Sequence, residues 1–446
     1  MDQQLQQKST DDPKPGPSSR NSEVQYQQAI RDIIADPPTL EDLGVPSSII
    51  NDLILRLTRQ EGEASVRQIT DTLALSLRLL DVLLLRMQQE HLIEIARAGS
   101  MGRSSYIYRL TEEGQARAKD AFDRSQYIGP IPVPVDKYNQ AILLQTRQRR
   151  HLSPSEVQDG LQSLILPDNF HRRIGPAVNA GSSLFLYGPP GNGKTTVAEA
   201  IAGMIAATDA IWMPYAVTTG GQVISVYDQL VHKSVELNKE EGDAVDRRWG
   251  KFRRPAVMVG GELTMAALDL RYDEIGKFYE APLQLKANGG MFLIDDFGRQ
   301  QMKPQELLNR WIVPLESGFD FLRLRTGQTF MMPFRQLIVF STNLDPNELV
   351  DGAFLRRIQM KVQVESPDER MFRQIFMVNC QKLQIPPDKD SYLHLIQEWY
   401  VKPKRLLQAV HPRDLLKIVR SLCEYENQPV RLTPDMIDEA CQSYFV

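Results

Sequence analysis

The sequence predicts an α/β protein with a parallel sheet, preceded by a winged helix-turn-helix domain and followed by an all-helical domain. Between about residues 153 and 364, apolar runs alternate with helical segments, which is typical of a parallel sheet covered by helices. Residues 38–125 contain three helical segments and then two strand-like runs, which is the winged helix-turn-helix order. Residues 365–446 contain amphipathic helical segments and no strand signals.

The composition is that of an ordinary globular protein. The chain has 446 residues and a formal net charge of −4, whereas a dedicated nucleic-acid binder is usually basic. The cysteines are few and scattered, which favours a reducing compartment over a disulfide framework or a zinc site. We find neither a secretory h-region nor an apolar run of about eighteen residues, and we therefore expect a cytoplasmic protein with no membrane span.

The segments outside the predicted domains are polar or rich in proline. Residues 1–25 are nearly free of large apolar side chains, and we expect them to form a disordered tail. Residues 126–152 begin with a proline-rich run of alternating valines and end in the basic run RQRRH, residues 147–151. This composition predicts an extended linker.

A phosphate-binding loop is the most specific functional signal. The apolar run LFLYG leads into GPPGNGKT and then into a helical segment, which is the strand–loop–helix context of a P-loop. Its glycines let backbone N–H groups converge on a phosphate, while Lys194 contacts the β- and γ-phosphates and Thr195 is a Mg²⁺ ligand. The expected nucleotide-binding residues are Gly188, Pro189, Pro190, Gly191, Asn192, Gly193, Lys194, Thr195 and Thr196.

Two later strand-like runs also end in polar side chains. The run MFLI ends at Asp295 and Asp296. Asp295 suits a Mg²⁺ or Mg²⁺-water ligand, and Asp296 suits the carboxylate that orients or deprotonates the attacking water. The run LIVFST ends at Asn343, whose amide can hold that water or sense the γ-phosphate.

Arginines follow these strands. Arg356 and Arg357 precede a last strand-like run, and Arg413 lies at the start of a helix that Pro412 helps to begin. In this order, the motifs resemble the AAA+ ATPase superfamily over roughly residues 160–440. The resemblance implies that Asn343 is sensor 1, Arg413 is sensor 2, and Arg356 or Arg357 is the arginine finger that reaches the neighbouring subunit's γ-phosphate.

The resemblance extends to domains, cofactor and assembly. It implies an AAA+ core at residues 153–364, a helical lid at residues 365–446, Mg·ATP as ligand, and a homo-oligomeric ring, expected to be a hexamer. Residues 164–167, LILP, occupy the place where the family lines its adenine pocket. The implied catalytic residues are Lys194, Asp296, Asn343, Arg356, Arg357 and Arg413.

The chain also shows features of one clade and departures from the family. The segment FDFLRLRTGQTFMMPF predicts a hairpin that resembles the pre-sensor-1 hairpin clade, which includes MoxR-like ATPases, and Arg310 before it is another candidate trans-acting arginine. Asp296 stands where the family usually has Glu, which leaves slow hydrolysis and a nucleotide switch open. Tyr215 with the glycines of residues 220–221 does not give an aromatic–hydrophobic–Gly pore loop, so protein threading is not supported.

Two segments raise the question of DNA binding. Residues 41–125 carry eleven Arg and Lys against thirteen Asp and Glu, and the expected recognition helix, residues 76–90, is mostly Leu. The run RRWGKFRR, residues 247–254, interleaves cations with aromatics and suits single-stranded nucleic acid, although a solvated or interface loop is favoured. We therefore favour a chaperone-like remodeller of an unidentified protein client, with a DNA-associated ATPase or transcription regulator as the alternative.

Overall fold

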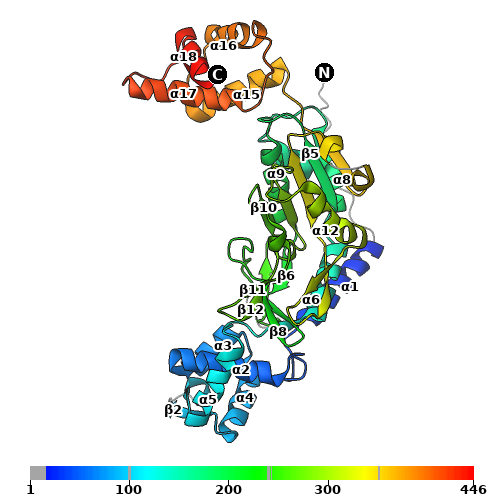
Figure 1. Ribbon diagram of the computed structural model, residues 1–446, viewed down its shortest axis with the longest axis vertical. Helices are drawn as coiled ribbons and strands as arrows, with labels where there is room; N and C mark the ends of the chain where they lie inside the picture. The colour runs from blue at the N-terminus through cyan, green and yellow to red at the C-terminus, as the bar shows by residue number, and fades with distance from the viewer. Residues whose placement is uncertain (1–16, 99–101, 239–241, 243, 350–351, 446) are drawn as a thin grey trace, which may run out of the picture.

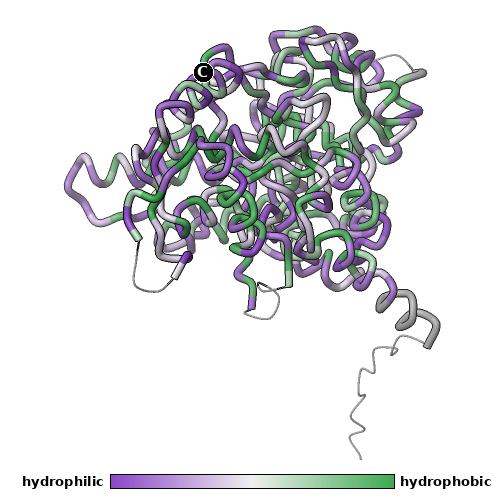
Figure 2. Tube along the Cα trace, turned by 90° about the horizontal axis from the view of Figure 1, so that it is seen from below, coloured by the Kyte–Doolittle hydropathy of each residue, from purple (hydrophilic) through white to green (hydrophobic). Residues whose placement is uncertain are grey.

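The computed structural model is an elongated, curved molecule with a helical domain at each end and sheets between them (Figure 1). It describes residues 17–98, 102–238, 242, 244–349 and 352–445. Figure 2 shows hydrophobic stretches through the middle of the molecule and hydrophilic ones along the outer loops. None of the helices in this described part of the chain has both the length and the apolar character needed to cross a bilayer.

The central sheet has five parallel strands in the order β10-β13-β16-β5-β17. Side chains along each strand alternate between two apolar layers, since Leu184 and Leu186 pack toward helix α9 (Lys194–Ala206) while Phe185 packs toward helix α12 (Pro304–Ser317). The predicted α/β fold with a parallel sheet is confirmed. Its strands are β5 (Ser183–Tyr187), β10 (Ala256–Val259), β13 (Met291–Ile294), β16 (Leu337–Thr342) and β17 (Met360–Gln363).

Helices cover both faces of this sheet. One face carries α7 (Pro154–Leu161), α8 (Phe170–Ala180) and α9 (Lys194–Ala206). The other face carries α12 (Pro304–Ser317), whose Trp311 is fully buried against Phe292 and Phe334. Short helices complete this region: η2 (Met265–Leu268), α11 (Leu283–Lys286), α13 (Pro346–Leu349) and α14 (Gly352–Leu355).

Further sheets lie beside the central one, and most of their strands come from the chain between α9 and β13. A five-stranded sheet has the order β11-β12-β8-β7-β4, and β6 pairs with β9. The hairpin expected before sensor 1 is present, because β14 pairs antiparallel with β15. The strands are β4 (Val133–Pro134), β6 (Ile211–Pro214), β7 (Ala216–Thr219), β8 (Gln222–Ser225), β9 (Trp249–Phe252), β11 (Arg271–Asp273), β12 (Phe278–Glu280), β14 (Phe319–Arg323) and β15 (Thr329–Pro333).

The predicted extended linker at residues 126–152 is wrong over residues 135–147, because α6 (Val135–Arg147) is a helix there. Its buried side chains, Tyr138, Ala141, Ile142 and Gln145, follow helical spacing. The prolines before this helix favoured an extended structure, although the helical periodicity of residues 135–147 was present in the sequence.

The predicted disordered tail is also too long, because α1 (Pro17–Ile34) includes residues 17–25. Ile30 and Ile34 at its far end pack with Trp212 and Trp249, which gives this helix an apolar surface to lie on. Residues 1–16 lie outside the described residues.

The N-terminal domain combines helices with a small antiparallel sheet of order β1-β3-β2. Its apolar core is built mainly from the leucines of α2 and α4. Residues 99–101, in the expected wing, lie outside the described residues. The elements are α2 (Ser47–Glu61), β1 (Glu63–Ser65), α3 (Val66–Leu73), α4 (Leu77–Gln89), β2 (Ile93–Arg97), η1 (Arg103–Ser105), β3 (Ile107–Leu110) and α5 (Glu112–Arg124).

The basic run at residues 247–254 is not a solvated loop, and its aromatic side chains are not available to bases. Trp249 and Phe252 are buried in β9. Arg248 is fully buried and pairs with Asp246 at 2.8 Å, while Arg254 is buried and pairs with Asp209 at 2.6 Å. Arg248 and Arg254 therefore neutralise carboxylates of this chain, and the hypothesis that the run binds single-stranded nucleic acid through exposed aromatics and cations is wrong.

The C-terminal residues form a helical domain with its own apolar core. Cys380, Cys423 and Cys441 are buried in it as free thiols. The helices are α15 (Glu369–Leu383), α16 (Lys389–Ile396), the π-helical turn η3 (Gln397–Val401), α17 (His411–Tyr425) and α18 (Pro434–Tyr444). Backbone contacts tie this domain to the central sheet's loops, since the Val410 N–H donates to the Gly191 carbonyl at 2.8 Å.

Candidate nucleotide-binding site

The loop between β5 and α9 has the backbone form that a bound phosphate needs. Gly188, Gly191 and Gly193 have φ of 141°, 75° and 86°. A Cβ at Gly188 would lie 2.3 Å from the Val364 carbonyl oxygen, so a side chain there would clash with backbone. Gly193 precedes α9 with no side-chain cap, which leaves the first N–H groups of that helix available to an anion.

Lys194 lies inside this loop and holds it closed. Its ammonium donates to the carbonyls of Gly188 and Pro189, each at 2.9 Å, and to Asn343 Oδ1 at 2.6 Å. Burial lowers the pKa of Lys194, and the charges of Asp296 and Asp295 partly oppose that shift. The side chain is 6% exposed, so its charge acts in a poorly hydrated place next to the phosphate-binding loop.

The carboxyl ends of β13, β16 and β5 bring the remaining polar residues to the same place, because these strands are parallel neighbours. Thr195 Oγ1 donates to Asp295 Oδ2 at 2.7 Å, and Asn343 Nδ2 donates to Asp296 Oδ1 at 3.1 Å. The sequence-predicted residues Lys194, Thr195, Asp295, Asp296 and Asn343 therefore form one hydrogen-bonded group.

Asp296 has a left-handed backbone, with φ of 49°. This conformation is uncommon for a residue other than glycine and is enriched at functional sites. Here it turns the chain directly after β13. Gln300 stabilises that turn, because its Nε2 donates to the Asp295 carbonyl at 2.9 Å and its Oε1 accepts from the Gly298 N–H at 2.8 Å.

Thr195 and Asp295 fit a Mg²⁺ ion by the chemistry of their donors, which are a hydroxyl and a carboxylate oxygen. The described residues contain no group of three or more His, Cys, Asp and Glu side chains that could hold a metal by themselves. Phosphate oxygens and waters would therefore complete the coordination of such an ion.

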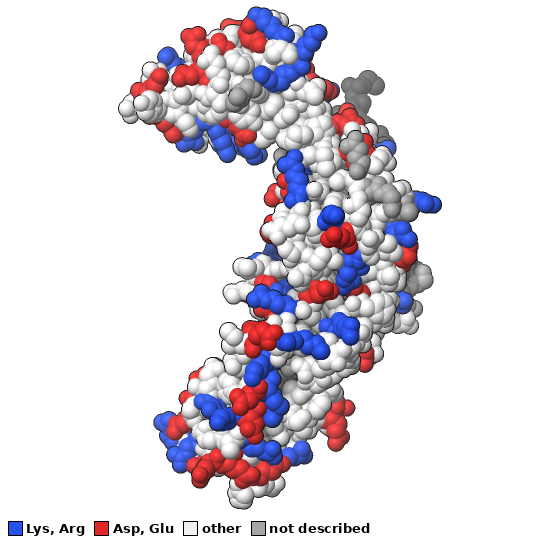
Figure 3. Space-filling view, in the orientation of Figure 1, with Lys and Arg blue, Asp and Glu red and all other residues white. Residues whose placement is uncertain are grey.

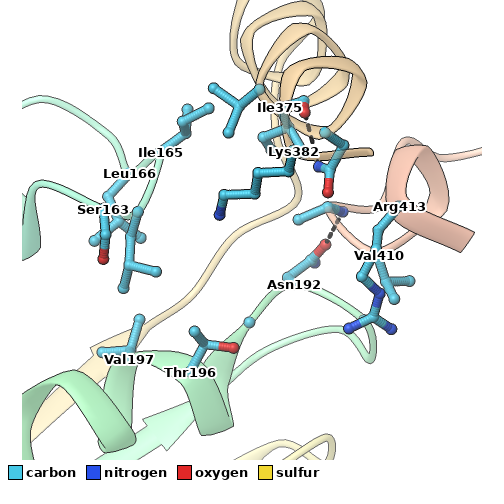
Figure 4. Close-up of a pocket in the computed structure, with 16 residues that line it drawn as sticks. Ser163, Ile165, Leu166, Asn192, Thr196, Val197, Ile375, Lys382, Val410 and Arg413 are labelled. Atoms are coloured by element: carbon cyan, nitrogen blue, oxygen red, sulfur yellow. Dashed lines mark hydrogen bonds between the residues drawn. The ribbon is translucent and has the colours of Figure 1, made fainter. Parts of the chain in front are cut away.

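A cavity of about 260 Å³ adjoins the loop and lies between the central sheet's helices and the C-terminal domain (Figure 4). Ile165 and Leu166 line one side of it, in keeping with the adenine pocket expected there, and Gly191, Asn192 and Thr196 form the floor. Pro167 does not line this cavity but borders a smaller one beside it.

Helix α15 supplies cavity residues that the sequence reading missed. Ile375, Val378, Asn379 and Lys382 line the cavity at positions i, i+3, i+4 and i+7 of this helix. Figure 4 shows the Lys382 side chain reaching toward the space above the loop. The amphipathic spacing was visible in the sequence, but nothing there indicated that this face meets the P-loop.

The candidate arginines occupy different places. Arg413 lines the cavity, and its Nε donates to Asp414 at 2.8 Å. Arg356 is exposed and donates to the Gly352 carbonyl of its own helix at 3.2 Å. Arg357 pairs with Glu316 at 2.6 Å, and Arg310 pairs with the buried Asp320 at 2.6 Å. Thus Arg310 and Arg357 already have carboxylate partners within this chain.

Two family models match parts of the chain. That of the ATPase family associated with various cellular activities (AAA) matches residues 184–241, which include the P-loop. A domain of unknown function, DUF8689, matches residues 368–443 and thus the C-terminal helices. No curated protein matches the chain.

Several solved structures show a weak likeness to this chain. A point variant of RuvB from Thermotoga maritima is 14% identical with a TM-score of 0.38, covering 64% of this chain and 71% of that one. NtrX from Brucella abortus is 13% identical with a TM-score of 0.37, covering 72% and 60%. A complex of BchI and BchD of magnesium chelatase is 17% identical with a TM-score of 0.32, covering 66% of this chain and 94% of that one. Scores below 0.5 do not by themselves establish a shared fold.

Proposed function

We propose that this chain, which carries an AAA-type ATPase segment at residues 184–241, hydrolyses Mg·ATP as an oligomer and uses the reaction to remodel a protein partner. ATP hydrolysis is the general activity of that family. The observation that carries the proposal is the hydrogen-bonded group of Lys194, Asn343 and Asp296 beside the uncapped start of α9. Such a group combines a phosphate-binding cation with a carboxylate for water activation.

Each residue has a distinct part in this mechanism. The loop N–H groups and Lys194 bind the phosphates, and a Mg²⁺ ion held by Thr195 and Asp295 neutralises phosphate charge when bound. Asp296 accepts a hydrogen bond from the attacking water and orients it for in-line attack. Asn343 fixes the direction of the Asp296 carboxylate, since its Nδ2 donates to that carboxylate while its Oδ1 accepts from Lys194.

We assign the C-terminal helices the role of a lid. Arg413 and Lys382 line the same cavity as Gly191 and Asn192, so both domains would contact one nucleotide. Loss of the γ-phosphate would remove a charge that Arg413 faces and would let the lid rotate. This motion would transmit hydrolysis to a bound partner.

Arg356 is the finger candidate that the contacts favour. It is exposed, and within the described part of the chain it donates to the carbonyl of Gly352 in its own helix, whereas Arg357 and Arg310 have carboxylate partners in this chain. A finger acts on the neighbouring subunit, so this assignment requires a ring, which we propose is a hexamer. The β14–β15 hairpin supports a place in the pre-sensor-1 hairpin clade, with its MoxR-like members.

We propose that residues 38–125 are a winged-helix domain that docks protein. Helix α4, in the place of a recognition helix, exposes Leu77, Val82 and Leu85 by 46%, 47% and 37%. Its Asp81 pairs with Arg103 at 3.2 Å, so the cation beside the wing is already neutralised. Figure 3 shows both charge signs mixed over this end of the molecule, whereas a DNA-binding face needs continuous positive charge.

The remodelling function predicts an ATP-dependent complex with a client. An Asp296→Asn variant should bind ATP without hydrolysing it, and it should retain a client in a pull-down that Lys194→Ala, which cannot bind ATP, does not retain. Equal recovery with both variants would show that capture is independent of the ATP state and would count against remodelling.

The alternative, a DNA-associated ATPase, rests on the element order of the N-terminal domain alone. Fluorescence anisotropy of the full chain with labelled duplex DNA at low salt tests it. We expect no binding; tight binding that weakens steeply as salt rises would favour the alternative over protein docking.

A further inference from the structure

A second concave site lies at the amino-terminal ends of the central strands, whereas the P-loop lies at their carboxyl ends. Arg147, Arg149, His151 and Arg335 line a cavity of about 160 Å³ there, together with Asn179 and Gly181. No acidic residue is among the residues that line it. Arg335 precedes β16 and Gly181 precedes β5, so the cavity is at the amino ends of strands whose carboxyl ends carry the nucleotide site.

The guanidinium groups in this cavity lack carboxylate partners. Among the described residues, no Asp or Glu oxygen lies within ion-pair distance of Arg147, Arg149 or Arg335. By contrast, the neighbouring Arg150 points away and pairs with Glu156. The basic run at residues 147–151 is thus divided between a paired surface arginine and a set of unpaired cations.

The backbone makes room for two of these guanidinium groups. Arg149 Nη1 lies 3.2 Å from where a Cβ of Gly181 would be, and Arg335 Cζ lies 2.7 Å from that of Gly318. Both glycines have positive φ, at 62° and 71°, and both end a helix. The Arg335 guanidinium also stacks on Phe319, with 5.6 Å to the ring centroid, which fixes its plane.

The other polar groups of the cavity are already hydrogen-bonded within the protein. The Asn179 side chain exchanges two hydrogen bonds with the Leu152 backbone, at 2.8 and 2.9 Å. The Thr146 hydroxyl donates to the Ile142 carbonyl at 2.7 Å. The groups left to bind a ligand are therefore the guanidinium groups, which donate hydrogen bonds and accept none, and the His151 imidazole, which can donate one.

Local charges leave this cavity positive. The C-terminal ends of α6 and α8 face it, and each helix end contributes about half a negative charge. Because the nearby Arg254 and Asp209 pair with each other, about two positive charges of the three arginines stay uncompensated. Burial lowers the pKa of Arg149 to about 10; the charge of Arg254 adds to that shift and the charge of Asp209 opposes it. Burial and the charge of Arg147 likewise lower the pKa of Arg335. An anion bound between these cations would stabilise their charged forms and would therefore oppose the lowering of both pKa values.

We propose that Arg147, Arg149, His151 and Arg335 bind a phosphate group at the amino-terminal ends of the central strands, opposite the P-loop. Planar guanidinium groups bind phosphate oxygens bidentately, and the charge left in the cavity matches a phosphate dianion or two adjacent phosphodiesters. The phosphate could belong to a free phosphate ligand or to a nucleic-acid backbone. This site is separate from the ATP site, and the proposal does not depend on ATP hydrolysis.

Binding to the full chain, with the P-loop filled by Mg·ADP, tests this proposal and distinguishes the two sources. Isothermal titration with inorganic phosphate is one arm, and anisotropy of a labelled single-stranded oligonucleotide at low salt is the other. We expect at least one arm to show binding. The double variant Arg149→Gln/Arg335→Gln should weaken it about tenfold or more, because it removes two charge-assisted contacts.

Arg150→Gln is the matched control, since it removes a neighbouring positive charge outside the cavity; it should weaken binding by about twofold or less. If only inorganic phosphate binds, the natural ligand is a small phosphate compound. If the oligonucleotide binds with a steep salt dependence, the phosphate belongs to a nucleic-acid backbone. Absence of binding in both arms, or equal binding by the wild type and the double variant, would overturn the proposal.

A thermal readout separates binding from a purely structural role. If the arginines bind phosphate, inorganic phosphate should raise the Tm of the wild type and not that of the double variant. If they only stabilise the ends of α6 and α8, the double variant should melt at a lower temperature and phosphate should not shift the wild type. That second result would also overturn the proposal.

Discussion

At the scale of single residues, Asn343 links the cation and the carboxylate of the candidate site. Its Oδ1 accepts from Lys194 at 2.6 Å and its Nδ2 donates to Asp296 at 3.1 Å. One amide thereby sets the positions of two charged groups, one at the start of α9 and the other just after β13. Asp296 itself stays in a left-handed backbone conformation, which costs roughly 1–2 kcal/mol and must be offset by such contacts.

Replacing Asn343 with Ala should reduce kcat for ATP by about a hundredfold, because one preorganised polar group is lost from the reacting centre. ATP affinity should change little, since the loop N–H groups and Lys194 remain. Asn347→Ala is a matched control, because Asn347 is exposed and its bonds within the described residues are to Asp345. Steady-state turnover and fluorescent-nucleotide binding would check both, and an unchanged kcat in Asn343→Ala would contradict the assigned role.

The two adjacent arginines should behave differently. Arg356→Ala should lower turnover about a thousandfold, as loss of a trans-acting finger does. Arg357→Ala removes a partly exposed pair with Glu316 and should cost about 0–1 kcal/mol of stability, with turnover largely kept. Turnover and urea unfolding of each variant measure the difference.

Mixing variants tests whether the finger acts between subunits. Arg356→Ala chains keep an intact P-loop, and Lys194→Ala chains keep an intact finger, so mixed assemblies should regain part of the turnover. If mixing restores nothing, or if Arg357→Ala is the inactive variant, the assignment of Arg356 is wrong.

At the scale of elements, α17 connects the nucleotide cavity to the core of the C-terminal domain. Arg413 lines the cavity, while His411 two residues earlier is 6% exposed and bonds the Tyr400 hydroxyl through Nδ1 at 2.9 Å. Burial, with a smaller contribution from the charge of Arg405, lowers the pKa of His411 from 6.5 to about 4. The native domain therefore holds this imidazole neutral.

This shift predicts how stability changes with pH. The unfolded chain binds the His411 proton more tightly than the native state, so stability is full above about pH 6.5 and falls as pH drops toward 4. Complete protonation would remove roughly 3 kcal/mol. Urea unfolding between pH 7 and pH 4 should show a smaller loss for His411→Gln than for the wild type; equal losses would contradict the assignment.

Strand β9 depends on a buried ion pair. Arg248 is fully buried and donates to Asp246 and to the Leu43 carbonyl, so it joins the N-terminal domain to the insertion sheets. Arg248→Met should lower the free energy of unfolding by about 3–5 kcal/mol, because Asp246 stays charged without its partner. Arg247→Met, which removes a pair between exposed side chains, should cost about 1 kcal/mol or less. Urea unfolding measures both, and similar losses would contradict this account.

Particular elements show what the sequence could and could not predict. The strand before the P-loop, the helix after it and the β14–β15 hairpin were predictable, because local periodicity and turn residues determine them. Arg248 and Arg254 were misread, because their burial depends on carboxylates and carbonyls supplied by other elements. The contribution of α15 to the cavity depends on how two domains pack, which no local pattern indicates.

At the scale of the whole molecule, the candidate ATP site lies where the sheet domain meets the C-terminal helices, and the N-terminal domain lies at the far end (Figure 1). In the proposed mechanism, a change in the angle between the sheet and the C-terminal helices would move the two ends of this long molecule relative to each other. Arg149 and Arg335 line a cavity at the amino-terminal ends of the central strands, away from the ATP site at their carboxyl ends.

The most direct test of the central claim is ATP turnover by the wild type and by Asp296→Asn, measured with nucleotide binding on the same samples. We predict Mg²⁺-dependent turnover by the wild type, and in Asp296→Asn a loss of about a hundredfold or more with ATP binding retained. Failure of the wild type to bind or hydrolyse ATP, or equal turnover by both proteins, would contradict it.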